Sequence, residues 1–355
     1  MRPSWFRGVL VAAVLAGVAT PSPAVDRLEH FLTVARDRLA VAVDGVERER
    51  AVGELYEVVD AEVLDSLRGD EPFSALGFIR ERLDAMTDSW GGATLRVLRI
   101  PAAGGRVPLT LGLYSLTGVE GSGSLRVYAG TGPGAVLAAS STHDGLLDVR
   151  VWPAGADRVA RVLAVWSGPA TAHGERSLHA ELWEGRERDR VARAWSTATQ
   201  WPEGLRVSDW RTQSGALVVR YEPRHPGWKP GCADQLEHED HYRLTAGGGL
   251  ALARRQVSNG WHRELGAATA RFFRALAEDD PRTLGLLVPA PAVRARLPRH
   301  LVAEPVCEQA GPAGPRGRVT VAATEVRDGR LVPWALAWTR GPAGWRLHAA
   351  APVLE

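Results

Sequence analysis

The sequence predicts an α+β protein whose helices and strands fall in separate stretches of the chain. Apolar residues recur at helical spacing in the first part, short alternating runs fill the middle, and the last 90 or so residues carry both patterns. With 355 residues, 45% of them hydrophobic and 24% charged, the chain has the composition of a folded protein of two or three domains. We expect a signal peptide at 1–24, a helical domain at 25–92, an antiparallel β-domain at 93–260 and a small α+β module at 261–355.

The first 24 residues have the pattern of a secretory signal peptide. Arg2 and Arg7 form a positively charged start, residues 8–19 are apolar, and small residues lead up to Ala24. The apolar run has about 12 residues, fewer than the ~20 that cross a bilayer as a helix. We therefore expect cleavage before Val25, a periplasmic or secreted location, and no integral membrane insertion after cleavage. An uncleaved membrane anchor is the alternative.

Residues 25–92 predict three amphipathic helices. Turn residues at 44–45, 69–72 and 91–92 separate the helices or end them. Short connections imply antiparallel neighbours that share one apolar seam. The apolar residues recur every three or four positions: Leu28, Leu32, Ala35, Leu39 and Val43, then Val52, Leu55, Val59, Val63 and Leu67, then Leu76, Ile79, Leu83, Met86 and Trp90.

The stretch from 94 to 257 predicts antiparallel sheets. About ten short runs with alternating or continuous apolar residues occur there, separated by glycine and proline. Their spacing favours a sandwich, a partial barrel or propeller-like blades. The runs cover 109–114, 124–128, 147–152, 159–166, 177–183, 191–196, 205–210, 216–221, 241–244 and 250–257.

The last module combines helices and strands. A long helix is predicted at 262–278, and a second helix begins at Asp280 and Pro281, with aspartate as the N-cap and proline at the first helical position. A proline-rich stretch then precedes three strand candidates at 318–326, 331–339 and 344–349.

This order of a long helix, a short helix and a meander ending in Gly344-Trp-Arg-Leu347 resembles the SnoaL-like α+β cone of the nuclear-transport-factor superfamily. The resemblance covers about a quarter of the chain. It implies that the last module is cone-like, and that it holds a small ligand or serves as a dimerisation or scaffold module. It transfers no catalytic residue to this sequence.

Cys232 and Cys307 are the two cysteines of the chain. An even number of cysteines in an exported protein favours a disulfide, and two separate buried thiols are the alternative. The bond would close a loop of about 74 residues. In the chain-entropy model such a loop contributes roughly 4–5 kcal/mol before native strain is subtracted.

One acidic, histidine-rich stretch is a candidate metal site. His225 precedes it, and Glu237, His238 and His241 lie within it. Carboxylates and imidazoles bind divalent metals, but they must converge on one point. If the stretch is a strand, His238 faces one way while Glu237 and His241 face the other. The alternative, which we favour, is a solvated loop leading into a strand.

Trp201 and Trp228 stand beside turn residues and are candidates for stacking on a ligand such as a sugar ring. Tryptophans on a β-surface can bind saccharides, but indole rings are also common in the cores of β-domains. Core packing is therefore the alternative for both residues.

Charge and motifs limit the function. The chain has 43 Lys and Arg against 41 Asp and Glu, and loss of Arg2 and Arg7 with the signal makes it neutral, so no nucleic-acid partner is expected. The glycine-rich stretch 130–135 is not followed by a helix long enough to bind a dinucleotide, and no cofactor is predicted. We predict an exported, non-catalytic binding or scaffold protein of the cell envelope that binds an unknown envelope component or small ligand. The alternative is a secreted hydrolase or metal-dependent enzyme that uses the His225 to His241 loop.

Overall fold

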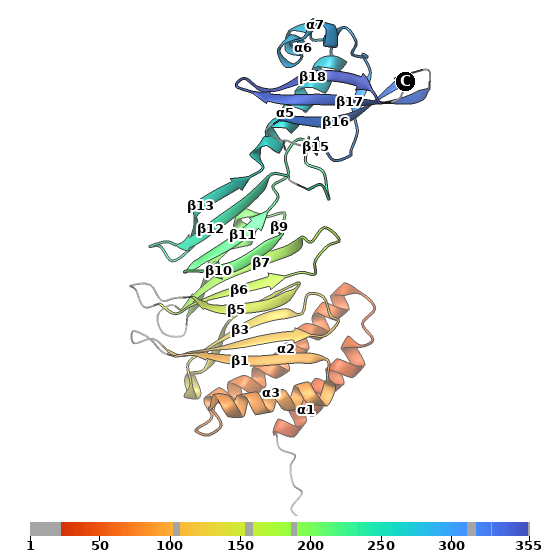
Figure 1. The fold of residues 1–355 in the computed structure, drawn as a ribbon. Helices are drawn as coiled ribbons and strands as arrows, with labels where there is room; N and C mark the ends of the chain where they lie inside the picture. The colour runs from red at the N-terminus through yellow and green to blue at the C-terminus, as the bar shows by residue number, and fades with distance from the viewer. Residues whose placement is uncertain are drawn as a thin grey trace, which may run out of the picture.

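The structure is a computed structural model that describes residues 23–101, 107–152, 159–185, 190–233, 235–310, 317–327 and 329–353. Residues 1–22 of the predicted signal peptide lie outside the described residues. The described chain is an α+β structure with four antiparallel sheets. Figure 1 shows three of the sheets stacked in chain order, with helices at one end of the stack and the C-terminal module at the other.

The three predicted N-terminal helices are present. Helix α1 (Pro23–Thr33) continues as a π-helical segment, η1 (Val34–Leu39), and is followed by α2 (Gly45–Arg68) and α3 (Leu76–Trp90). Asp44 caps α2, because its side chain accepts a hydrogen bond from the Glu47 backbone N–H at 2.8 Å. Helix α3 ends at Gly91, whose φ of 71° suits a glycine C-cap.

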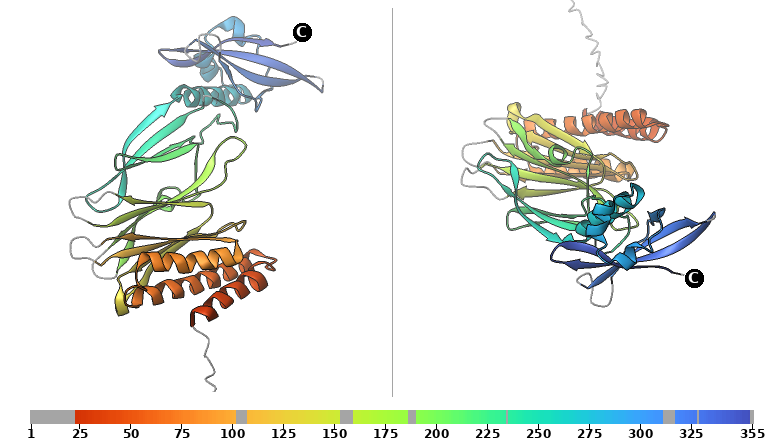
Figure 2. Two further views of the ribbon diagram at one scale, coloured as in Figure 1. Left: turned by 60° about the horizontal axis from the view of Figure 1, so that its bottom comes forward. Right: turned by 90° about the horizontal axis from the view of Figure 1, so that it is seen from above.

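The helices cover the outer face of the first sheet, as the two views of Figure 2 show. This sheet is a meander of β1 (Ala93–Ile100), β2 (Leu109–Leu116), β3 (Gly123–Ala129) and β4 (Val136–His143). Helices and sheet share one hydrophobic core, which includes Leu55, Val59, Ile79, Leu83, Leu95, Val97 and Tyr114.

The second sheet packs on the other face of the first. It consists of β5 (Leu146–Trp152), β6 (Arg161–Ser167), β7 (Arg176–Gly185) and β8 (Val191–Ser196), with β9 (Leu205–Val207) also paired to β7 and the short helix α4 (Thr197–Gln200) after β8. Strand β6 contacts a neighbouring sheet on each face, so both sets of its alternating side chains are buried. This explains its continuous apolar run from Val162 to Trp166.

The third sheet packs on the second and ends the stack. It is a meander of β10 (Asp209–Gln213), β11 (Ala216–Tyr221), β12 (Glu237–Leu244) and β13 (Leu250–Ser258). Its inner face contributes Leu217, Val219 and Tyr242 to a core shared with the second sheet. Strand β13 is exposed along nearly its whole length.

The C-terminal module has its own core. Helix α5 (Gly260–Ala277) packs against a sheet in the order β14 (Leu301–Ala303), β16 (Arg318–Arg327), β17 (Arg330–Gly341) and β18 (Gly344–Pro352), and β15 (Gln309–Ala310) also pairs with β16. The short helices α6 (Pro281–Leu287) and α7 (Pro291–Arg294) follow α5. Phe272, Leu276, Leu336, Trp338 and Trp345 share this core, as helix spacing and strand alternation predict.

The sequence patterns missed several elements. Strands β1 and β4 are absent from the ten predicted runs, and β12 begins at Glu237 rather than at 241. Strand β4 reads Val-Leu-Ala-Ala-Ser-Ser-Thr-His, which has small and polar residues in place of an apolar alternation. The proline-rich stretch contains α7, β14 and β15, each too short to give a periodic pattern.

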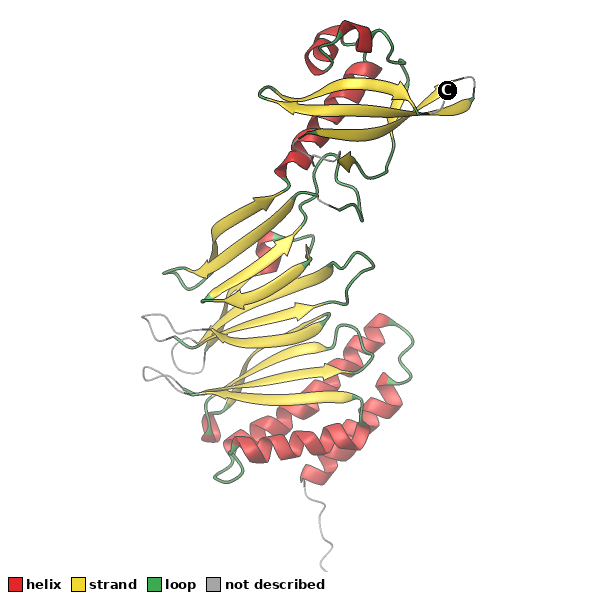
Figure 3. Ribbon diagram, in the orientation of Figure 1, coloured by secondary structure: helices red, strands yellow, loops and turns green. Residues whose placement is uncertain are grey.

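Figure 3 shows that the long helices lie toward the two ends of the molecule and that the region between them consists mainly of strands, with the short helix α4 among them. Within the part of the chain that the structure describes, no helix combines the length and the apolar character needed to cross a membrane.

Candidate functional site

The strongest cluster of chemically active side chains joins the first and second sheets. His143 ends β4, and His179 and Glu181 lie two positions apart on β7, so both project from the face of the second sheet that meets the first. Each residue offers one ligand atom, and these three atoms lie within 4.8 Å of one another. Among the described residues, this is the group of three histidine, cysteine or acidic side chains that meets the geometry of a metal site.

Glu181 is at the centre of the cluster and is fully buried. Its Oε1 lies 3.2 Å from His179 Nε2, 3.5 Å from His143 Nε2 and 2.8 Å from Nη1 of Arg193. Its other oxygen, Oε2, accepts a 3.0 Å hydrogen bond from the indole N–H of Trp183. Burial alone would raise the pKa of Glu181, but the hydrogen bonds from His143, His179 and Arg193 outweigh it and hold this pKa well below its ordinary value. Glu181 is therefore a buried carboxylate anion.

The two imidazole rings are held against each other. The ring centroids of His143 and His179 are 3.7 Å apart, with an angle of 32° between the planes. The buried indole of Trp166 meets the His143 ring edge-on, with centroids 4.8 Å apart. Trp166 is itself fixed, because its Nε1 donates a 2.7 Å hydrogen bond to the carbonyl of Gly123. The rings are thus positioned by the packing of one sheet on the other.

His143 also lines a groove of about 570 Å³ between helix α2 and the first sheet. Arg126 lies over the ring of Tyr56 on this groove, 5.2 Å from the ring centroid. Behind them the Tyr128 hydroxyl donates a short hydrogen bond to the buried carboxylate of Asp60. Acidic and basic side chains both line the groove: Arg48, Glu49, Glu120, Arg126 and Asp144.

The structure does not bring together the four residues of the sequence-predicted metal site. His238 faces the interior from β12, whereas Glu237 and His241 lie on the opposite face, as strand alternation predicts. His225 lies in the loop before β12, and its ring contacts the ring of His262 with centroids 5.3 Å apart. Strand alternation points His238 away from Glu237 and His241, and His225 lies outside the strand next to α5, so the four side chains do not converge on one ion.

A neighbouring acidic residue of that stretch belongs to a buried ion-pair network. The carboxylate of Asp240 is fully buried and accepts two 2.7 Å hydrogen bonds from Arg255 and 3.1 Å bonds from the hydroxyls of Tyr221 and Tyr242. Burial raises the pKa of Asp240, but the hydrogen bonds lower it by a larger amount, so the net shift of this pKa is downward. Its oxygens are fully engaged within the protein, which makes the network structural.

The two candidate stacking tryptophans are both half-buried. The Trp201 ring packs edge-on against Tyr221 and Tyr242, at 6.0 and 5.9 Å between centroids, and lies at the margin of the core between the second and third sheets. Trp228 donates a 3.2 Å hydrogen bond to Glu222 and lines a cavity of about 290 Å³ next to Cys232.

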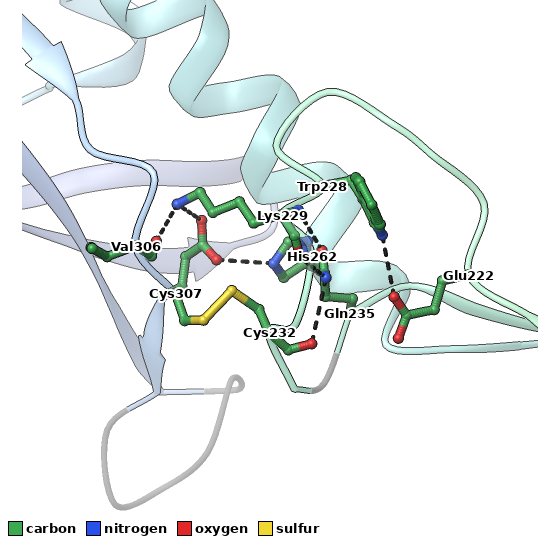
Figure 4. The surroundings of a disulfide bond; sticks show 9 residues. Glu222, Trp228, Lys229, Cys232, Gln235, His262, Val306 and Cys307 are labelled. Atoms are coloured by element: carbon green, nitrogen blue, oxygen red, sulfur yellow. Dashed lines mark hydrogen bonds and ion pairs between the residues drawn. A yellow bond between two sulfur atoms is a disulfide. The ribbon is translucent and has the colours of Figure 1, made fainter. Parts of the chain in front are cut away.

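Cys232 and Cys307 form a disulfide, with 5.4 Å between their Cα atoms. The bond joins the loop between β11 and β12 to the segment between β14 and β15 of the C-terminal module. Figure 4 shows Lys229 and His262 beside it. Nζ of Lys229 and Nε2 of His262 both contact Glu308, at 2.8 and 3.0 Å. The third sheet is therefore tied to the module by a covalent bond and by the contacts of Lys229 with Glu308 and with the carbonyl of Val306, whereas the His262–Glu308 contact lies within the module.

Sequence reasoning missed His143, His179 and Glu181. The pair His179-x-Glu181 carries one usable signal, since residues two apart on a strand share a face. His143 gives no such signal in the sequence, because its position beside His179 depends on how the two sheets stack.

The chain matches no protein-family model, no curated protein and no solved structure.

Proposed function

We propose that the protein is an exported, non-catalytic binding or scaffold protein of the cell envelope. The observation that carries this proposal is the disulfide between Cys232 and Cys307. Disulfides persist in oxidising compartments outside the cytoplasm, and here the bond holds two separately packed parts of the chain together. An envelope location is consistent with the signal-like segment at 1–24.

A binding or scaffold role is supported by the way the described charged groups are used. The buried carboxylates of Asp240 and Glu181 are each paired with a partly exposed arginine, Arg255 and Arg193 respectively. The groove lined by His143 and the cavity lined by Trp228 offer two surface depressions of about 570 and 290 Å³ for a ligand.

For the C-terminal module we propose the cone-like arrangement that its sequence resembles. The support is the order of a long helix α5, a short helix α6 and the meander of β16, β17 and β18. The concave side of such a sheet faces the long helix, and here α5 contributes Leu265 and Phe272 to the core that the sheet also lines. In this proposal the module is a platform for a small ligand or for dimerisation.

The test is to express the whole chain with a C-terminal affinity tag in a Gram-negative host and to fractionate the cells. We expect periplasmic protein that begins at Val25, with both cysteines protected from thiol-labelling reagents until a reductant is added. We also expect part of it to sediment with isolated envelopes. Cytoplasmic protein with intact Met1 and two reactive thiols would contradict export. Oxidised periplasmic protein that never sediments with envelopes would contradict the envelope role.

A further inference from the structure

We propose that His143, His179 and Glu181 bind a divalent transition-metal ion, with Zn²⁺ as the preferred ion. This inference goes beyond the proposed function and does not depend on it. Two imidazole nitrogens and one carboxylate oxygen are a common ligand set for zinc, with a fourth position left for water or a ligand. The three side chains come from two sheets that pack on each other.

The two distances from Glu181 fit one ion, and all three ligand atoms lie within 4.8 Å of one another. Ligand atoms at about 2.0–2.1 Å from a tetrahedral zinc lie about 3.4 Å from one another. The observed distances from Glu181 Oε1 are 3.5 Å to His143 Nε2 and 3.2 Å to His179 Nε2. Both nitrogens lie beside the same carboxylate oxygen, and Nε2 of His143 also lies 3.0 Å from Oγ of Ser141. An ion that enters between them replaces these hydrogen bonds and releases the protons that the two nitrogens donate.

The surroundings hold the ligands in place. Trp183 binds Oε2 of Glu181 and thereby leaves Oε1 as the oxygen that faces the imidazoles. Trp166 supports the ring of His143 from the core. Such outer contacts orient metal ligands and normally contribute to affinity. The His143 and His179 side chains keep 31% and 22% of their surface exposed, so an ion from solvent can reach them.

Removal of Arg193 distinguishes a metal site from a purely structural ion-pair network. Its Nη1 lies 2.8 Å from Oε1 of Glu181, and its side chain is 53% exposed. A long, exposed arginine can move away when a divalent ion takes over the negative charge. If the cluster is a metal site, Arg193 competes with the ion, and its removal strengthens metal binding. If the cluster is only an ion-pair network, its removal creates no metal affinity.

The chain contains a matched control. On β12, His241 and Glu239 repeat the spacing of His179 and Glu181, two positions apart on a strand, with His241 Nε2 3.0 Å from Glu239 Oε1. Two arginines bind this glutamate, and none of the metal-compatible groups among the described residues includes it. One imidazole and one carboxylate are expected to bind zinc far more weakly than three ligands.

The experiment measures Zn²⁺ binding to the oxidised, metal-stripped full chain in competition with a chromophoric chelator. We expect one ion per chain, and the visible spectrum of tetrahedral Co²⁺ when Co²⁺ replaces Zn²⁺. His143→Ala and His179→Ala should each lower the affinity more than about 100-fold, since even the loss of an outer contact costs 10–100-fold. Arg193→Ala should raise it, and His241→Ala should leave it unchanged.

Three results would overturn the proposal: no Zn²⁺ binding by the wild type, wild-type affinity in both histidine variants, or loss of binding in His241→Ala. Circular dichroism establishes that each variant is folded. Glu181→Gln is a further variant. If this change at a buried position prevents folding, the variants of the two partly exposed histidines still test the proposal. Failure of metal binding leaves the export and envelope experiments unaffected, so the two proposals can fail separately.

Discussion

Nζ of Lys229 lies 2.8 Å from Oε1 of Glu308, and this ion pair links the loop before β12 to the C-terminal module directly beside the disulfide. The same carboxylate is 3.0 Å from His262 at the start of helix α5. Both lysine and glutamate are mostly buried, with 16% and 10% of their side-chain surface exposed. The junction between the two parts of the molecule is therefore held by covalent, ionic and hydrogen-bonding contacts at one place.

Removing the disulfide should destabilise the oxidised protein. Cys232→Ser or Cys307→Ser abolishes the cross-link and is expected to cost about 2–4 kcal/mol, because the unfolded chain regains the entropy of an open loop. Scanning calorimetry of both variants should show a melting temperature several degrees below that of the wild type. The reduced wild type is the control and should melt with the variants. Identical melting of oxidised and reduced wild type would show that the cross-link adds no stability.

Glu308 should make the junction sensitive to acid. Burial by itself raises its pKa, but the hydrogen bonds from His262 and Lys229 prevail and lower it from 4.5 to about 2. A group with a lowered pKa in the folded state stabilises the protein above the unfolded-state pKa, and this contribution is lost as the pH falls from about 5 to about 2. We expect Glu308→Gln to be less stable than the wild type at pH 7. Between pH 5 and pH 2 the variant should lose less stability than the wild type does.

The control for this prediction is Glu264→Gln. Glu264 also forms an ion pair in the C-terminal module, 2.6 Å from Arg340, but both side chains are 46% exposed, and exposed pairs contribute little. Urea denaturation between pH 2 and pH 7 measures both variants. A wild-type and a Glu308→Gln protein with the same pH dependence would exclude the junction as an acid-sensitive element.

Phe272 should be essential to the core of the C-terminal module. It is fully buried on α5 and contacts the ring of Trp338 edge-on, with centroids 5.6 Å apart. Phe272→Ala leaves a cavity and is expected to cost about 3–5 kcal/mol. The exposed Val326 on β16 of the same module provides the control, since Val326→Ala should change stability by less than about 0.5 kcal/mol. Chemical denaturation compares the two, and equal effects would refute the proposed core position.

Two helical glycines should respond in opposite directions to alanine. A Cβ at Gly266 on α5 would lie 2.1 Å from the carbonyl oxygen of Pro226, so Gly266→Ala should push the helix away from this loop and destabilise the junction. A Cβ at Gly285 on α6 would meet nothing within 4 Å. Gly285→Ala should stabilise by about 0.5–1 kcal/mol, because alanine loses less backbone entropy in a helix. Thermal melting measures both, and stabilisation by Gly266→Ala would disprove the close contact.

Several features of the molecule are determined by local sequence, and these could be predicted. Asp280 caps α6 by accepting hydrogen bonds from the backbone N–H groups of Arg282 and Thr283, as an aspartate before a helix-starting proline should. The alternation of Glu237, His238 and His241 between two faces also follows from the strand period alone. With two cysteines in the chain, one intramolecular pairing was available for a disulfide.

Tertiary structure alone decided the stacking of the sheets and the cluster that it creates. Strand β4 has no apolar alternation, so its sequence gave no reason to place His143 in a strand or against another sheet. The rings of His143 and His179 meet at 3.7 Å because the first sheet packs on the second through an apolar interface. A period of two or 3.6 residues reports which face of its own element a side chain occupies. It carries no information about which distant element packs on that face. For this reason the sequence offered its candidate metal ligands on and before β12, in a stretch where a solvated loop was favoured, and gave no sign of the cluster at the interface of two sheets.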